Sequence, residues 1–103
     1  MADYHRELRK DKALLDYVFD WAANTNGDTT ETDWLVSGDA IATKSVTVES
    51  GLAKQSDTLI NTNTAVRVWL NAQSSELGTY LVTCDIVTDD GREDSRTLEV
   101  EVI

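Results

Sequence analysis

Hydrophobic and polar residues alternate along several short stretches of the chain, which is the pattern of half-buried β-strands. Residues 14–21 show it most clearly. Four apolar side chains fall on one side of this stretch and two aspartates on the other: Leu15, Tyr17, Phe19 and Trp21 against Asp16 and Asp20. A polar loop rich in turn-forming residues follows at 22–33. We therefore predict a strand over residues 14–21 that leads into a long loop.

Residues 40–48 and 64–70 predict two further strands. In the first of them, Ile41 is out of phase with the valines that follow, which predicts a β-bulge near Lys44 or a strand that changes sheets. Residues 52–63 have no clear period, and we expect only a short strand near residues 58–60.

Residues 80–102 predict a β-hairpin with an acidic turn. A two-residue turn would place the apolar side chains of the two arms on opposite faces of the ribbon, which is costly. A three-residue loop at 89–91 aligns the two apolar faces and gives Gly91 the positive φ of a G1 bulge. This register predicts two cross-strand pairs: Tyr80 with Val100 and Val82 with Leu98. It also places Asp94 and Arg96 on one face, where they can pair with each other or meet a neighbour.

Short strands separated by turn-forming loops, with no convincing long helix, indicate an all-β fold: an Ig-like antiparallel β-sandwich. A length of 103 residues suits one domain. We expect the sandwich over residues 14–103. Residues 1–13 are expected to form a short flexible arm, because Tyr4 and Leu8 are its only apolar i,i+4 pair. The last strand, 97–103, is expected to be an edge, either protected by its glutamates or open to a strand from a neighbouring subunit.

The charge of the chain excludes some partners. Lys and Arg number 9, Asp and Glu number 19, and the formal net charge is −10. Nucleic-acid binding needs a basic patch, so we expect no nucleic-acid partner. We expect no membrane partner, because no apolar run is long enough to cross a bilayer, and the polar N-terminal residues show no secretory signal. The acidic balance favours docking onto a basic surface.

The residues that catalysis or metal binding would require are scarce. Cys84 is the only cysteine and His5 the only histidine, so neither a disulfide nor a Cys/His zinc site can form within the chain. Cys84 lies in an alternating apolar run and is interpreted as a core residue, while His5 is expected to be solvated. No Ser/His/Asp system or glycine-rich phosphate loop is present. We expect no catalytic residues, no metal site and no cofactor.

Two acidic segments and three tryptophans leave alternatives open. A calcium site in the hairpin would draw on five carboxylates: Asp85, Asp89, Asp90, Glu93 and Asp94. Their spacing does not fit a calcium loop, so a solvated hairpin tip is favoured, and the acids at 28–33 are interpreted in the same way. Trp21, Trp34 and Trp69 suit either a carbohydrate platform or core and interface anchors. For Trp34 and Trp69 the core or a subunit interface is favoured.

Several motifs, in order, resemble a family of small tailed-phage virion proteins described as fiber–tail adaptors or related head and tail components. The motifs are LLDYVFDW at 14–21, WLVSGDAI at 34–41, VESGL at 48–52, VWL at 68–70 and GTYLVTCDIVTDDGREDSR at 78–96. The chain departs from the family at residues 10–13, where members often carry Lys-Asp-Pro-Asp, and in the loop at 22–33, which resembles an insertion.

The resemblance implies a non-enzymatic structural protein of a virion, assembled in the host cytoplasm. It would join or stabilise components of the capsid, neck or tail, with other phage structural proteins as partners and as a homo-oligomer within the particle. The alternatives are a capsid decoration (cement) protein on the outer shell and, more remotely, a carbohydrate-binding module. The candidate interface residues are Tyr4, Leu8, Arg67, Trp69, Arg92, Asp94 and Arg96.

Overall fold

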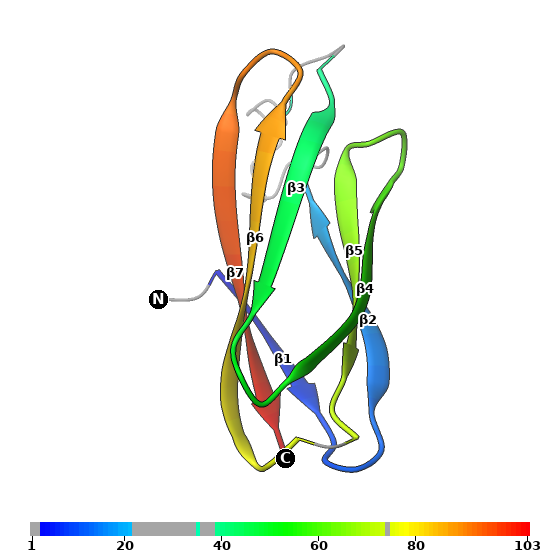
Figure 1. Ribbon diagram of the computed structural model, residues 1–103, viewed down its shortest axis with the longest axis vertical. Coiled ribbons are helices and arrows are strands. Elements are labelled where there is room, and N and C mark those ends of the chain that lie inside the picture. Colours follow the sequence, from blue (N-terminus) through cyan, green and yellow to red (C-terminus); the bar gives the residue numbers. More distant parts are fainter. Residues whose placement is uncertain (1–2, 22–34, 36–38, 74) are drawn as a thin grey trace, which may run out of the picture.

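The computed structural model describes residues 3–21, 35, 39–73 and 75–103, which form two β-sheets packed face to face (Figure 1). The strands are β1 (Tyr4–Leu8), β2 (Leu14–Asp20), β3 (Ile41–Val48), β4 (Ala53–Ile60), β5 (Ala65–Asn71), β6 (Gly78–Thr88) and β7 (Glu93–Val102). The described part of the chain contains no helix that could cross a membrane. The predicted all-β sandwich is confirmed. Trp34 and the acidic segment 28–33 lie outside the described residues.

Sheet A has the strand order β1-β7-β6-β3 and sheet B the order β2-β5-β4. In Figure 1, β7, β6 and β3 lie on the left and β2, β5 and β4 on the right. Neighbouring strands are antiparallel, except that β1 runs parallel to β7.

Strand β1 corrects two expectations. Residues 4–8, predicted to be part of a flexible arm, pair with β7 from Tyr4 opposite Leu98 to Leu8 opposite Val102. Tyr4 and Leu8 are four residues apart, a spacing that places them on one face of a strand as well as of a helix. Leu8 is buried in the core, and Tyr4 packs against it. Because β1 and β6 flank β7, the last strand is not an edge, contrary to expectation.

The β6–β7 hairpin has the predicted register. Tyr80 lies opposite Val100 and Val82 opposite Leu98. At the tip, the Thr88 N–H donates to Arg92 O at 2.8 Å, and the three residues 89–91 close the loop. Gly91 has φ 89°, the left-handed conformation that a G1 bulge requires.

Irregular pairing explains the two strands that were harder to predict. The bulge in β3 lies between Ile41 and Thr43, slightly before the expected position. Strand β4 is much longer than the short strand expected, and its register shifts between Lys54 and Ser56. Its alternation is weak because β4 is an edge strand whose side chains are mostly exposed.

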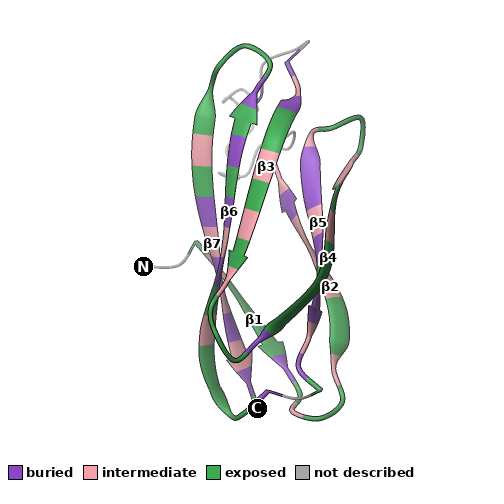
Figure 2. Cartoon of the chain, in the orientation of Figure 1, coloured by how far each residue is buried: buried purple, intermediate pink, exposed green. Residues whose placement is uncertain are grey.

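The core fills the space between the sheets, and along β6 and β7 buried and exposed residues alternate (Figure 2). Its fully buried large side chains come from both sheets and the adjoining segments: Trp21, Phe19, Leu8, Ile41, Leu70, Ile86, Leu98, Val66, Val68, Val82, Val100 and Cys84. Cys84 is the predicted core residue, and burial raises the pKa of its thiol to about 12. The thiol is therefore protonated at neutral pH and chemically inert.

One motif glycine has a packing role. Gly51, in the turn between β3 and β4, has φ 107°, a conformation that side chains rarely adopt. A Cβ at this position would lie 2.6 Å from the Tyr80 ring. The glycine of the VESGL motif therefore allows both the turn and the close approach of Tyr80.

Candidate functional site

Arg96 is the centre of a polar cluster that joins the two sheets. Its guanidinium donates to Asp94 Oδ2 at 3.3 Å, to Asp20 O at 2.9 Å and to Tyr4 Oη at 3.1 Å. It also lies 4.6 Å from the centroid of the Trp21 ring, within range of a cation–π interaction. Trp21 Nε1 donates to the same Asp94 oxygen at 2.8 Å. These contacts link β7 of sheet A to the end of β2 in sheet B.

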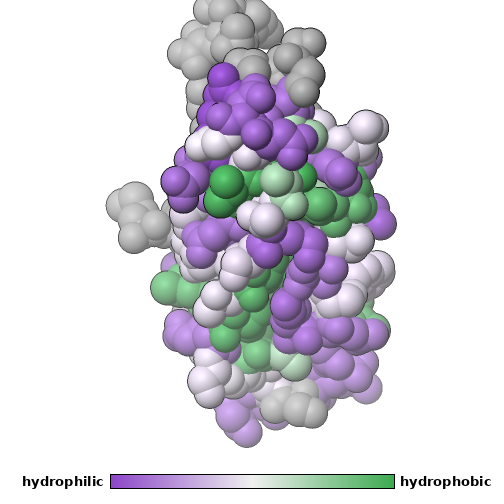
Figure 3. Space-filling view, turned by 45° about the horizontal axis from the view of Figure 1, so that its top comes forward, coloured by the Kyte–Doolittle hydropathy of each residue, from purple (hydrophilic) through white to green (hydrophobic). Residues whose placement is uncertain are grey.

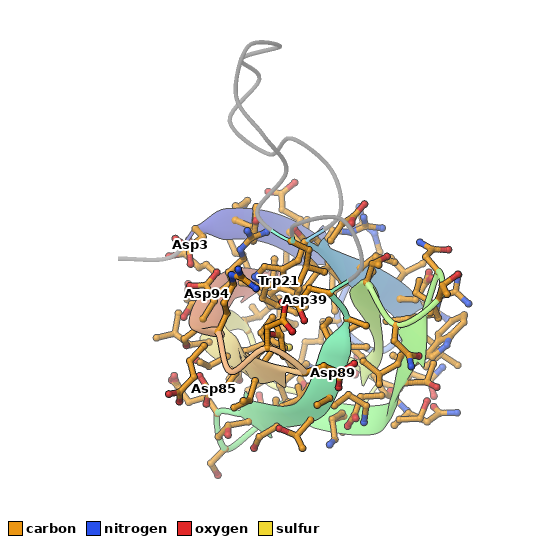
Figure 4. All side chains as sticks on the ribbon, turned by 90° about the horizontal axis from the view of Figure 1, so that it is seen from above. Asp3, Trp21, Asp39, Asp85, Asp89 and Asp94 are labelled. Carbon is orange, nitrogen blue, oxygen red and sulfur yellow. The ribbon has the colours of Figure 1, made fainter. Side chains whose placement is uncertain are left out.

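We call Trp21, Asp94 and Arg96 the buried triad. It gives a structural role to the Asp and Arg that end the motif at 78–96. Figure 4 shows Trp21 and Asp94 close together when the molecule is viewed from above. The sequence left open whether Asp94 and Arg96 pair with each other or meet a neighbour, and in the structure they pair with each other at 3.3 Å. Arg96 is only 8% exposed, so it stabilises the fold and offers little surface to a partner. The same holds for Leu8, another candidate interface residue, which is 1% exposed.

Asp39, just before β3 in sheet A, anchors the tip of the β6–β7 hairpin. Its carboxylate accepts the N–H groups of Ala40 at 2.9 Å and Asp90 at 3.2 Å, and Arg92 Nη1 donates to it at 2.8 Å. Burial would raise the pKa of Asp39, but hydrogen bonds from Thr88, the Asp90 backbone and Arg92 outweigh it and hold the pKa below its ordinary value. The carboxylate is therefore ionised and fixes the loop.

Arg92 accordingly helps to hold the hairpin tip, and part of its side chain remains accessible to a partner. Its guanidinium contacts both Asp39 and Asp90, while its side chain stays 42% exposed. The sequence does not predict that the Asp39 carboxylate contacts the hairpin. The signal was present only as a Gly-Asp pair before a strand, which predicts a turn.

The hairpin acids do not converge into a calcium site. Asp94 bonds to Trp21, and Asp90 pairs with Arg92. Asp85 lies at the rim of the molecule in Figure 4, away from Asp94.

Among the described residues, the acidic and metal-binding side chains close enough to share an ion are His5, Glu7 and Glu101, and all three are at least partly exposed. His5 Nδ1 lies 3.1 Å from Glu99 Oε1, so the expected solvated histidine is held by β7.

Trp69, Arg67 and Asp16 form a second set of the same residue types on the outer face of sheet B; we call it the exposed triad. Asp16 of β2 and Ser56 of β4 lie opposite Trp69 in register. Arg67 Nε is 3.2 Å from Asp16 Oδ2, although the N–H is not aligned for a hydrogen bond. Trp69 is 36% exposed and the Arg67 side chain 41%. Of the seven candidate interface residues, Arg67 and Trp69 lie together on the outer face of β5, where both are accessible to a partner.

The described residues offer an interaction surface more readily than a reactive site. Cys84 is buried, and the single histidine lies on the outer face of β1 beside glutamates. Trp21 is buried, so it cannot join a carbohydrate platform with Trp69. What the arrangement can provide is a rigid sandwich that presents aromatic and charged side chains to a partner.

A comparison with known families agrees with this reading. Residues 10–101 match the family described as podophage GP4 fiber-tail adaptor protein gp77. The match spans β2 to β7 and nearly the whole sandwich, including the motifs that form the buried triad and the hairpin anchor. No curated protein matches the chain. The chain belongs to the podophage GP4 fiber-tail adaptor protein gp77 family.

Proposed function

We propose that this chain is a non-enzymatic structural protein of a tailed-phage virion, an adaptor that joins the fibre to the tail. The observation that carries the proposal is the family match over residues 10–101. The fold supports it, because the two sheets are tied together at one end by the hydrogen bonds from Arg96 to Asp20 O and from Trp21 to Asp94, which makes a stiff spacer. A protein that transmits load between two larger assemblies needs such stiffness more than it needs a flexible or reactive site.

The exposed triad is the part of this surface that we assign to a partner. Interfaces concentrate binding energy in tryptophan and arginine, and Arg67 and Trp69 stand two residues apart on one strand. The side chains directly opposite Trp69 are polar, Asp16 and Ser56, while its diagonal neighbour Leu14 is an exposed apolar residue, so the ring is the centre of a small mixed apolar and polar surface. That arrangement suits docking between proteins, with the symmetry of the tail repeating the contact around its axis.

Deletion of the gene from the phage tests the proposal. We expect particles with filled heads and assembled tails that lack fibres, and we expect wild-type protein supplied from a plasmid to restore them. Negative-stain electron microscopy and a stained gel of purified particles provide the readout. Deletion particles that keep their fibres would overturn the adaptor function. Copy number on the same gel separates the decoration alternative, because a cement protein would be present at the high copy number of the shell.

A further inference from the structure

The outer face of sheet A is strongly acidic. Its outward positions carry carboxylates on three adjacent strands, identified by the register and by their alternation with buried residues: Glu7 on β1, Asp85 on β6, and Glu93, Glu99 and Glu101 on β7. Among the described outward positions of β1, β7, β6 and β3, none is a lysine or an arginine, and His5 is the one basic side chain. Figure 3 shows hydrophilic side chains over much of one face of the molecule, with hydrophobic patches between them.

An open depression of about 870 Å³ lies on this face where β3, β6 and β7 run side by side. We call it the acidic groove. Lys44 also lines it but is paired with Asp57, and the exposed side chains of the lining are Thr43, Ser45, Asp85, Val87, Glu93 and Ser95. It lies just below the hairpin tip, which Asp39 and Arg92 hold in place. The floor is therefore part of the stiff end of the sandwich.

The register arranges these six residues in two rows across the three strands. One row runs from Ser45 through Asp85 to Ser95. The other runs from Thr43 through Val87 to Glu93. Asp85 and Glu93 are thus diagonal neighbours, whose Cβ atoms are about 7–8 Å apart in a regular sheet. A single cationic group placed between them would lie within reach of both carboxylates.

The two carboxylates have no cationic partner among the residues that the structure describes. Within the described part of the chain, neither Asp85 nor Glu93 forms an ion pair, whereas Asp39, Asp57 and Asp94 each pair with an arginine or lysine. Val87 lies beside them with 37% of its surface exposed. An apolar floor next to two free carboxylates complements the aliphatic stem and charged head of an arginine or lysine side chain.

We propose that the acidic groove binds an arginine side chain from an exposed basic segment of the adjoining tail protein. The inference rests on the proposed function, since it names the chemistry by which the adaptor recognises its partner. Arginine is favoured over lysine because its planar guanidinium presents several N–H donors at fixed angles and can donate to Asp85 and Glu93 together. The hydroxyls of Thr43, Ser45 and Ser95 offer further acceptors around it.

Competition for places in the particle tests this proposal. Phage lacking the gene is grown in cells that express tagged wild-type protein and one untagged variant in equal amounts. The variant D85N/E93Q removes both groove carboxylates. The matched control E49Q/E76Q removes two exposed carboxylates near the opposite end and changes the net charge equally. The ratio of untagged to tagged protein is then measured in purified particles.

We expect the groove variant to be depleted about tenfold and the control to remain near the ratio in the cell, because loss of the ion pairs weakens docking. Equal incorporation of the groove variant would overturn the arginine-binding groove and leave the adaptor function standing. Absence of the wild-type protein itself from particles would overturn the adaptor function instead. Urea unfolding of each variant checks that folding is unchanged, and the single variants D85N and E93Q replace a double variant that is destabilised.

Discussion

The buried and the exposed triad contain the same three residue types in different surroundings. In one, Trp21, Asp94 and Arg96 join the two sheets, and Arg96 is 8% exposed. In the other, Trp69 and Arg67 lie on the outer face of sheet B with more than a third of each side chain accessible. The distance between arginine nitrogen and aspartate oxygen is nearly the same in both triads, 3.3 Å in the buried one and 3.2 Å in the exposed one.

The difference teaches that burial, more than the contact distance, decides what such a set does. An ion pair whose arginine is buried and hydrogen-bonded is costly to break, because Asp94, only 29% exposed, would keep its charge with limited access to water. The pair of Arg67 and Asp16, with side chains 41% and 39% exposed, contributes little to stability. The buried triad therefore serves the fold, and the exposed triad is free to serve a partner.

Replacement of the two arginines should show the largest contrast. R96A removes the partner of Asp94 and the bond to Asp20 O, and we expect the free energy of unfolding to fall by about 3 kcal/mol. R67A, the matched change at the surface, should lower it by about 0.5 kcal/mol or less. Urea denaturation followed by tryptophan fluorescence measures both. Equal losses would show that the two triads do not differ as described.

Replacement of the two tryptophans by phenylalanine should show a smaller contrast. W21F removes the indole N–H that donates to Asp94 and leaves space in the core, so we expect a loss of about 2 kcal/mol. W69F removes an N–H that water can replace, and the expected loss is about 0.5 kcal/mol or less. The same denaturation assay applies. A W69F variant as unstable as W21F would mean that Trp69 belongs to the core.

The contact of Asp39 with the hairpin tip should make the free energy of unfolding depend on pH. The folded-state pKa of Asp39 lies below its unfolded value, so its stabilisation is fully present above about pH 4 and is lost as pH falls through the lower folded pKa. D39N should be less stable than wild type at pH 7, and this difference should shrink below about pH 4. Urea midpoints of both proteins from pH 7 to pH 2.5 provide the measurement. A difference that stays constant throughout would remove Asp39 from this role.

Removal of the whole Trp69 ring should affect stability modestly and assembly strongly. W69A should change the free energy of unfolding by about 1 kcal/mol or less, because the ring lies on an exposed strand face. It should nevertheless reduce the amount of the chain in purified particles, since anchoring tryptophans carry much of the energy of an interface. Quantitative immunoblotting of particles complemented with W69A or wild type measures this. Unchanged incorporation would exclude the exposed triad as the docking site.

The parts of the fold that the sequence predicted are those set by local patterns. Alternation identified the strand at residues 14–20, and the parity of the last two strands fixed the hairpin register and the position of Gly91. Cys84 followed from the same alternation. In each case the information lies within a few residues, because side chains alternate between the faces of a strand.

Strand β1 and the buried triad could not be predicted in this way. The charges of residues 4–8 obscure the two inward-facing side chains, and the partner strand β7 is about 90 residues away in the chain. The bond from Trp21 to Asp94 spans 73 residues, and that from Asp90 to Asp39 spans 51. Such contacts depend on the strand order, and one sequence does not reveal which acid meets which donor.

The candidate interface residues were chosen by residue type, and the structure shows that some of them are exposed and others buried. Arg67 and Trp69 lie on an exposed face, whereas Arg96 and Leu8 lie inside. The acidic groove was missed because its side chains come from three strands and are individually ordinary. Only the register of β3, β6 and β7 brings two carboxylates and an apolar floor together.

A reconstruction of the intact virion tests the central claim, that this sandwich is an adaptor between fibre and tail, most directly. The account predicts density for the β-sandwich domain at the junction of the tail and the fibre, repeated by the tail symmetry, with the outer sheet faces against neighbouring proteins. Density for this chain on the capsid shell, or a junction built without it, would contradict the account.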